Sequence, residues 1–435
     1  MKRLILPLAI CASIICARGQ SLVDEQADSL MASHRIISLG DGKVTATAPD
    51  NPAVRERIYS FYYDQFRHAQ DPEAPYFMFL SKDDKLLMGI GGTIRMRAWY
   101  DWGGSVPSSG FSPIQIPMTP DPAARKHLGT TPAGTCLFFR LAGQSSLLGY
   151  YSAYIEANFN GWSGSDFHLK KAYVTVRDFT VGYAASTFSD PAAVPMYVDA
   201  NGPSNKFSRT AVLVRYMPQI ARHWYVGASV EAPETAVAAD QVKTEKCTAY
   251  IPDFAALVQY EWARGQHLRL AGIVRSLPYR DLVAEKNHNL AGWGMQLSTV
   301  SHPCAPLTVY GTFNYGCGYA GLGGDLLVGS YDLISNPDQA GRLYAPRSLG
   351  WCLGVQYNIR RDLFVTLAGS QTRFLPQKQI DPSEYKYGLL GTFNIFWNPT
   401  PRLQFGAEID LAKRQNFSRE HRYARRFGLM GQITF

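Results

Sequence analysis

The sequence has no apolar run past Ala17 that is long enough for a transmembrane helix, which needs about 20 residues. Charged residues make up only 18% of the 435 residues, and seven cysteines form no CxxC pair. No GxSxG motif is present. These absences argue against a helical membrane protein, a zinc-binding module and a hydrolase with a nucleophile elbow.

The N-terminus has the layout of a secretory signal peptide. Met1-Lys2-Arg3 is basic, and Leu4 to Ala17 is nearly all apolar and ends in small residues. This run is too short for a membrane anchor. We therefore predict that residues 1–20 are a signal peptide and that the chain is exported. Export argues against a nucleic-acid partner, so the net charge of +8 points to a membrane surface or an anionic solute.

Residues 21–84 are predicted to form a helical segment in the periplasm. Residues 20–39 fit a short helix. A second helix over 52–70 is indicated by Val54, Ile58 and Phe61, which recur at helical spacing after Pro52. The apolar stripe predicts packing against the rim of the following domain or against a neighbouring subunit.

From Lys85 onward, apolar and polar residues alternate with a period of two. Examples are Ile94–Ala98, Tyr151–Phe159 and Leu403–Ile409. In a soluble sandwich this alternation puts one face in the core, whereas in a membrane barrel it puts one face in lipid and the other in water. The alternation alone does not distinguish a soluble sandwich from a membrane barrel.

Loop lengths favour the barrel. Short connectors alternate with long stretches rich in Pro, Gly and Ser, which is typical of periplasmic turns and outer loops around an even number of strands. We predict an all-β fold over residues 85–435, a transmembrane antiparallel β-barrel in the outer membrane. The predicted strands number about sixteen: 85–101, 135–144, 147–159, 166–177, 179–188, 207–217, 222–232, 252–263, 266–277, 288–301, 305–317, 348–359, 362–374, 384–398, 401–415 and 424–435.

Aromatic residues fit the same fold. The final strand ends in Phe435, as outer-membrane barrels often do, and aromatic side chains near strand ends would form the girdles at the lipid interfaces. The girdle candidates are Trp99, Tyr100, Trp224, Tyr225, Trp262 and Trp397.

The alternation assigns charged residues to the lumen, because a charge facing lipid at mid-depth costs roughly 2–4 kcal/mol. The predicted pore-lining basic residues are Arg95, Arg97, Arg140, Lys171, Arg209, Arg215, Arg269 and Arg275. Glu156, Glu408 and Asp410 share the inner face. Either the charges pair and only keep the lumen wet, or the basic excess favours small anions. The loop over 189–206 is predicted either to fold into the lumen or to remain on the surface.

Four short motifs resemble one family. They are Leu86–Gly92, Phe188–Pro191 before Asn201–Pro203, Pro252–Phe254, and Gln266–Arg275. These motifs are similar to those of the DcaP-like porins, which are related to the phosphate-selective porins O and P. The resemblance covers roughly residues 85–435. The dense lysine ladder of the phosphate-selective members has no match in this sequence.

The resemblance implies a trimeric sixteen-stranded barrel in the outer membrane that passes small anions such as dicarboxylates. It also implies a basic lumen, and this role carries over best onto Arg95, Arg209, Arg269 and Arg275. Neither a cofactor nor a metal is expected.

Two other functions compete with a porin. A barrel hydrolase would need a Ser/His or Asp/His constellation, but His168, His223 and His302 are scattered along the sequence. Catalysis is therefore not expected. A surface binding or adhesion barrel is the other alternative. Five cysteines of the mature chain leave any disulfide unassigned: Cys136, Cys247, Cys304, Cys317 and Cys352.

Overall fold

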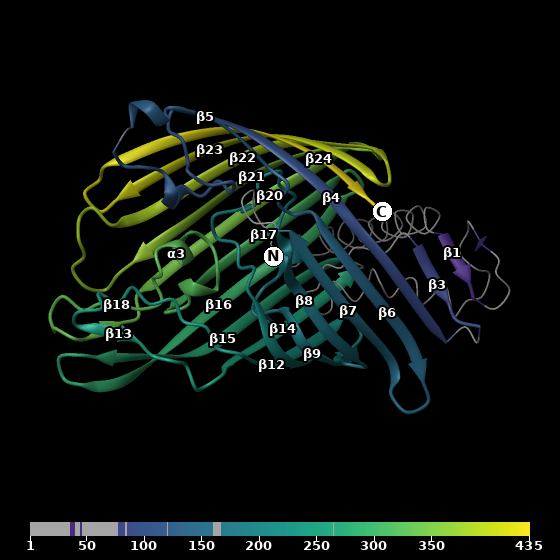
Figure 1. Ribbon diagram of the computed structural model, residues 1–435, viewed down its shortest axis with the longest axis horizontal. Coiled ribbons are helices and arrows are strands. Elements are labelled where there is room, and N and C mark those ends of the chain that lie inside the picture. The colour runs from purple at the N-terminus through teal and green to yellow at the C-terminus, as the bar shows by residue number, and fades with distance from the viewer. Residues whose placement is uncertain are drawn as a thin grey trace, which may run out of the picture.

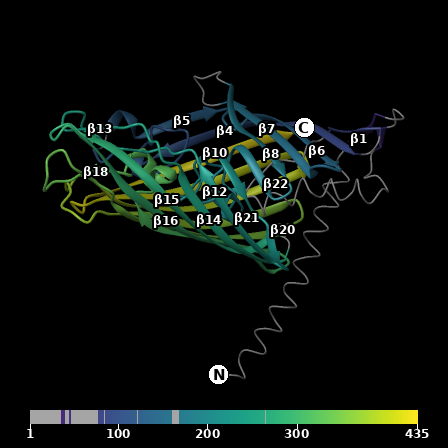
Figure 2. The same ribbon diagram turned by 90° about the horizontal axis from the view of Figure 1, so that it is seen from below.

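Long antiparallel strands form the wall of a closed barrel in the computed structural model (Figures 1 and 2). The structure describes residues 35–39, 44–45, 77–82, 85–119, 121–159, 167–263 and 265–435. The sixteen wall strands are β4 (Leu86–Trp102), β6 (Cys136–Ser145), β7 (Gly149–Phe159), β8 (Phe167–Val176), β9 (Phe179–Ala185), β10 (Thr210–Tyr216), β12 (Trp224–Glu231), β14 (Asp253–Ala263), β15 (Gln266–Asp281), β16 (Lys286–Cys304), β17 (Leu307–Cys317), β20 (Arg347–Arg360), β21 (Leu363–Leu375), β22 (Tyr385–Thr400), β23 (Leu403–Asn416) and β24 (His421–Thr434).

The last strand closes the barrel on the first. β24 runs antiparallel to β4, with Gly428 opposite Trp99 and Gln432 opposite Arg95. Closure leaves no open sheet edge, so every backbone group in the wall can find a partner inside the sheet. The predicted all-β barrel is therefore confirmed. Each of the sixteen predicted strands overlaps one wall strand, and β9 ends earliest relative to its prediction, at Ala185 instead of residue 188.

The outer surface of the wall is apolar, as the alternation predicts. In β15, Leu268, Leu270 and Val274 are exposed, whereas their neighbours Arg269 and Arg275 are buried on the inner side. Among the described residues, no helix is long and apolar enough to cross a membrane.

The segment before β4 contains strands among its described residues. β3 (Phe77–Leu80) pairs with β4, and β1 (Arg35–Ser38) runs parallel to β3 and pairs with β2 (Val44–Thr45). The helix predicted over 20–39 is therefore wrong at its end, because Ile36 and Ile37 suit a strand and find a partner in β3. The predicted helix over 52–70 and signal peptide over 1–20 lie outside the described residues.

Three long loops fold into the barrel. We call them loop A (residues 103–119), loop B (186–209) and loop C (318–346). Loop A contains the 3-10 helix η1 (Pro113–Gln115), loop B contains η3 (Pro191–Ala193), and loop C contains η4 (Ala320–Leu322) and α3 (Asp325–Val328). All three follow strands at the end of the barrel opposite the short turns, which is the outer end of a barrel of this class.

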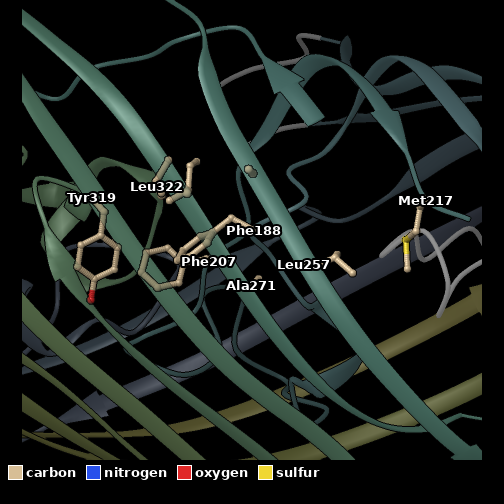
Figure 3. Packing of buried hydrophobic residues seen from close by; sticks show 9 residues of the cluster. Phe188, Phe207, Met217, Leu257, Ala271, Tyr319 and Leu322 are labelled. Atoms are coloured by element: carbon tan, nitrogen blue, oxygen red, sulfur yellow. The ribbon is translucent and has the colours of Figure 1, made fainter. Parts of the chain in front are cut away.

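Apolar residues of these loops pack against inward-facing residues of the wall. Figure 3 shows one cluster, in which Phe188 and Phe207 of loop B lie close to Tyr319 and Leu322 of loop C. The ring centroids of Phe188 and Phe207 are 5.4 Å apart, and those of Phe207 and Tyr319 are 5.5 Å apart. Loops B and C thus form part of the packed interior, not a free surface.

Candidate functional site

Loop B crosses the lumen and is attached to the wall along its whole length. At its start, Asp190 Oδ2 lies 2.8 Å from His267 Nε2 of β15. In its middle, the backbone N–H groups of Val198 and Asp199 donate to the carboxylate of Glu408 on β23 at 2.8 and 2.7 Å. Of the two predictions for residues 189–206, insertion into the lumen is the one that the structure confirms.

The second half of loop B is fixed by small polar side chains. Ser204 N donates to Ser370 Oγ of β21 at 3.0 Å, and Asn205 Nδ2 donates to Thr312 Oγ1 of β17 at 2.9 Å. Loop B therefore covers the inner face of the strands from β15 to β24. Strands β4 and β8, which carry Arg97 and Lys170, lie outside this covered part of the wall.

The anchor at Asp190 is strongly electrostatic. Burial alone would raise the pKa of Asp190, but the charges of Arg269 and His267 hold it well below its ordinary value. Arg269 Nη1 lies 3.5 Å from Asp190 Oδ1 and also donates to Ser189 O. Ionised Asp190 therefore holds the start of loop B against the wall.

Ser298, His267 and Asp190 lie together, as a hydrolase triad would, but their connections differ from those of a triad. Ser298 Oγ donates to Asp190 Oδ2, the same oxygen that faces His267, so the serine is bonded to the acid and not to the base. All three are fully buried. This geometry suits a structural anchor rather than a nucleophile, which must be bonded to its base and reachable by substrate.

The eight predicted basic residues all have their side chains on the inner side of the barrel. Six are buried: Arg140, Lys171, Arg209, Arg215, Arg269 and Arg275. Arg95 and Arg97 are half-buried. Burial alone does not show which of them carry unbalanced charge, and their role as pore-lining residues stays a prediction.

Arg209, Arg269, Arg275 and Lys171, four of the buried six, form ion pairs with described residues. Arg209 Nη1 lies 2.7 Å from Asp253 Oδ2, and Arg275 contacts both Asp253 at 3.3 Å and Asp332 of loop C at 2.9 Å. Arg269 faces Asp190, and Lys171 Nζ lies 3.6 Å from Glu156 Oε2. The three arginines attach loops to the wall, whereas Lys171 links two neighbouring wall strands, so the alternative of paired lumenal charges describes all four well.

Arg95 and Arg97 differ from the buried group. Arg95 Nε donates to Gln432 Oε1 at 2.6 Å, and Arg97 Nη1 donates to Ala133 O at 3.0 Å. Within the part of the chain that the structure describes, neither guanidinium has a carboxylate at ion-pair distance.

Two lysines that the sequence did not single out complete this region. Lys206 of loop B is half-buried, and burial lowers its pKa. Asp199 opposes that change, whereas the positive charges of Lys170 and Arg97 add to it. Charges that affect one another lie near one another. We call Arg95, Arg97, Lys170 and Lys206 the basic cluster.

The basic cluster is only partly neutralised. Lys170 Nζ lies 2.5 Å from Glu156 Oε1, but that carboxylate is shared with Lys171. Asp199 is 3.3 Å from Arg426 Nη1. The ammonium group of Lys206 has no hydrogen bond or ion pair within the described ranges. Among the described residues, Arg95, Arg97 and Lys206 thus have no carboxylate at ion-pair distance, so this part of the lumen is rich in positive charge.

Local structure explains why sequence reasoning missed these lysines. Strict alternation would send Lys170 and its neighbour Lys171 to opposite faces, but a β-bulge opposite Glu156 lets both ammonium groups reach that carboxylate. Lys206 lies in a loop without any periodicity. The only sequence signal for it is its place in the low-charge stretch before Arg209.

Solved structures with a similar fold are outer-membrane proteins. The outer-membrane channel DcaP of Acinetobacter baumannii matches with a TM-score of 0.69 and 18% identity, over 82% of this chain and 99% of that one. The trimer form of OmpT from Vibrio cholerae matches with a TM-score of 0.52 and 10% identity, over 81% and 100%. No family model and no curated protein match the sequence. At these identities the likeness establishes the outer-membrane barrel fold.

Proposed function

We propose that the protein is an outer-membrane channel that prefers small anions, including dicarboxylates. The observation that supports this most directly is the basic cluster, where loop B narrows the lumen. Cations on the walls of a narrow aqueous passage raise the local concentration of anions and lower the barrier to their entry. The similarity to DcaP and the sequence resemblance to its relatives support the same solute class.

The inward packing of loops A, B and C makes an adhesion barrel the weaker alternative. Phe111 of loop A, Phe188 of loop B and Leu322 of loop C are buried against the wall. Residues fixed in this way cannot grip a ligand outside the cell, whereas they can shape a passage.

Reversal potentials across a KCl gradient test the anion preference. We expect the wild type to be anion-selective, and selectivity to fall in Arg95→Ser/Arg97→Ser and in Lys206→Gln. Lys378→Gln is the matched control, because this outer-loop lysine is paired with Asp338 and lies outside the basic cluster. The preference should weaken from 0.1 to 1 M salt as the screening length shrinks from ~10 to ~3 Å.

Cation selectivity in the wild type would contradict the proposal, as would selectivity unchanged by both variants. Repeating the measurement with potassium succinate in place of chloride tests the dicarboxylates. A dicarboxylate current that the Lys206→Gln variant reduces would support them as solutes.

We also infer a homotrimer embedded in outer-membrane lipid. The sequence resemblance and the trimer form of the structurally similar OmpT support this state, and the outer faces of early strands, with Ala153 in β7 and Ala172 in β8, are small enough for close contact. Light scattering of the purified protein in detergent should give three copies per particle. A monomer in this measurement would contradict the inferred trimer but would not affect the channel proposal.

A further inference from the structure

The carboxylate of Asp325 lies where all three inserted loops meet. Asp325 is the first residue of α3 in loop C and is only 3% exposed. Ser112 Oγ of loop A donates to its Oδ1 at 2.6 Å, and Tyr385 Oη of β22 donates to its Oδ2 at 2.9 Å. Its own backbone N–H donates to Ser204 O of loop B at 2.8 Å.

Loops B and C come unusually close beside this residue. Gly323 and Gly324, which precede Asp325, both have positive φ angles, 149° and 69°. A Cβ on Gly324 would lie 2.8 Å from Ser204 O, and one on Gly323 would lie 2.7 Å from Lys206 O. Glycine is therefore required twice in succession, and Asp325 is held directly against loop B.

The surroundings of the carboxylate are apolar. Ile114 of loop A, Leu326 and Tyr331 of loop C, and Phe374 of β21 form one buried cluster together with Tyr385. No cation in the described part of the chain pairs with Asp325. An ionised carboxylate at such a place lacks the compensation that a buried charge needs.

Charged and titratable groups on the neighbouring elements are already engaged. Arg414 of β23 donates from Nη1 to Ile114 O at 2.6 Å and to Ile116 O at 3.1 Å, so its guanidinium group binds the backbone of loop A. Tyr331 donates to Glu384 Oε2 at 2.7 Å. The loop B groups Asp199 and Lys206 belong to the ion pair with Arg426 and to the basic cluster.

A proton on Asp325 would complete a continuous hydrogen-bond chain. Tyr385 Oη lies 3.3 Å from Thr372 O as well as 2.9 Å from Asp325 Oδ2, but it has only one proton to donate. When Asp325 is protonated, its own O–H can donate to Tyr385 Oη, and Tyr385 can donate to Thr372 O. Ser112 still donates to Oδ1, so every group has a partner.

We propose that protonated Asp325 is a latch that holds loops A, B and C together in the outer half of the barrel, and that its ionisation loosens them. As a control on ion flow, the latch rests on the proposed channel function. Burial raises the pKa of Asp325 from its ordinary value of 3.8 to about 7. The latched state therefore binds the proton more tightly than a hydrated carboxyl group does, and latching is strongest in acid.

The direction with pH follows from this difference. Between pH 3.8, the ordinary pKa of an aspartate carboxyl group, and about pH 7, each pH unit shifts the equilibrium between the latched and the loosened state toward the loosened state by up to about tenfold. Above about 7 both states are ionised and no further shift occurs. The outer mouth should be more restricted at pH 5 than at pH 8.

Two measurements on the full-length barrel test the latch. Single-channel recordings from pH 4.5 to 8.5 should show a one-proton rise in conductance or open probability in the wild type. Hydrogen exchange of residues 103–119, 186–209 and 318–346, corrected for the intrinsic effect of pH, should show protection that falls over the same range. The second measurement does not require a conducting channel.

Asp325→Asn separates the latch from other titrating groups. The amide is neutral at every pH and can still accept from Ser112 and donate to Tyr385, so this variant should remain latched with a flat profile in both measurements. Asp338→Asn, an exposed position in the same loop, should keep the wild-type profile.

A wild type without pH dependence in hydrogen exchange would overturn the latch, as would an Asp325→Asn variant with the wild-type profile or a flattened profile in Asp338→Asn. Absence of conductance at every pH would remove the channel proposal alone, and hydrogen exchange would still decide the latch.

Discussion

Individual arginines inside the barrel mainly attach the inserted loops to the wall through ion pairs. Arg275 shows this most fully, because it contacts Asp253 on β14 and Asp332 in loop C. Asp332 in turn accepts from the backbone N–H groups of Ala236 and Gly321. A buried charge is tolerated only when its partners are in place, so each of these contacts fixes the position of a loop.

Removing Asp253 should therefore destabilise the folded barrel. Asp253→Ala leaves Arg209 without its carboxylate and Arg275 with only one, which for buried pairs costs about 3–5 kcal/mol. The measurement is the temperature at which the compact form is lost in detergent, followed by gel mobility. Asp362→Ala is the control, because its pair with Arg360 is exposed at a short turn and should contribute little. Equal effects of the two variants would contradict this role of Asp253.

At this scale the sequence could place side chains but not assign their partners. Alternation put all eight predicted basic residues on the inner side. Whether an inward arginine is neutralised depends on residues far along the chain, such as Asp332 for Arg275, 57 positions away. Among the described residues, the positive charge without a carboxylate at ion-pair distance lies with Arg95, Arg97 and Lys206, and no period could identify Lys206.

Elements differ in how far the sequence determines them. The wall strands were predictable because lipid on one side and packed or wet interior on the other impose a strict period of two. Even β15, with Pro278 near its end, keeps pairing with β16 up to Asp281 opposite Lys286. The helix predicted over 20–39 failed at Arg35–Ser38 because pairing with β3 outweighed the local pattern.

The inserted loops were beyond sequence reasoning for a physical reason. Loop B has no periodicity, and its path is set by contacts to residues up to 227 positions away, such as Arg426 for Asp199. The sequence could show that a loop of this length exists before Arg209, but not which wall residues hold it.

At the scale of the whole molecule, closure and the apolar outer belt are two aspects of one constraint. β24 contributes to both, since it pairs with β4 to close the barrel while Leu429 and Phe427 point outward. A polar group on this face would meet hydrocarbon at mid-depth but water or headgroups near the strand ends. The membrane thus makes the cost of a substitution depend on its position along the strand.

Leu429→Arg and Tyr423→Arg test this dependence on one face of one strand. Both positions are about half exposed on the outer surface, but Leu429 lies near the middle of β24, whereas Tyr423 lies close to its outer end. Arginine should cost roughly 2–4 kcal/mol at the first position and about 0–1 kcal/mol at the second. Urea titration of the barrel refolded into lipid vesicles measures both values. In unheated gel samples the wild type and Tyr423→Arg should keep the faster mobility of a closed barrel, with less of that form in Leu429→Arg. Equal costs at the two positions would mean that this face does not meet hydrocarbon, and the orientation of the barrel in the membrane would have to be revised.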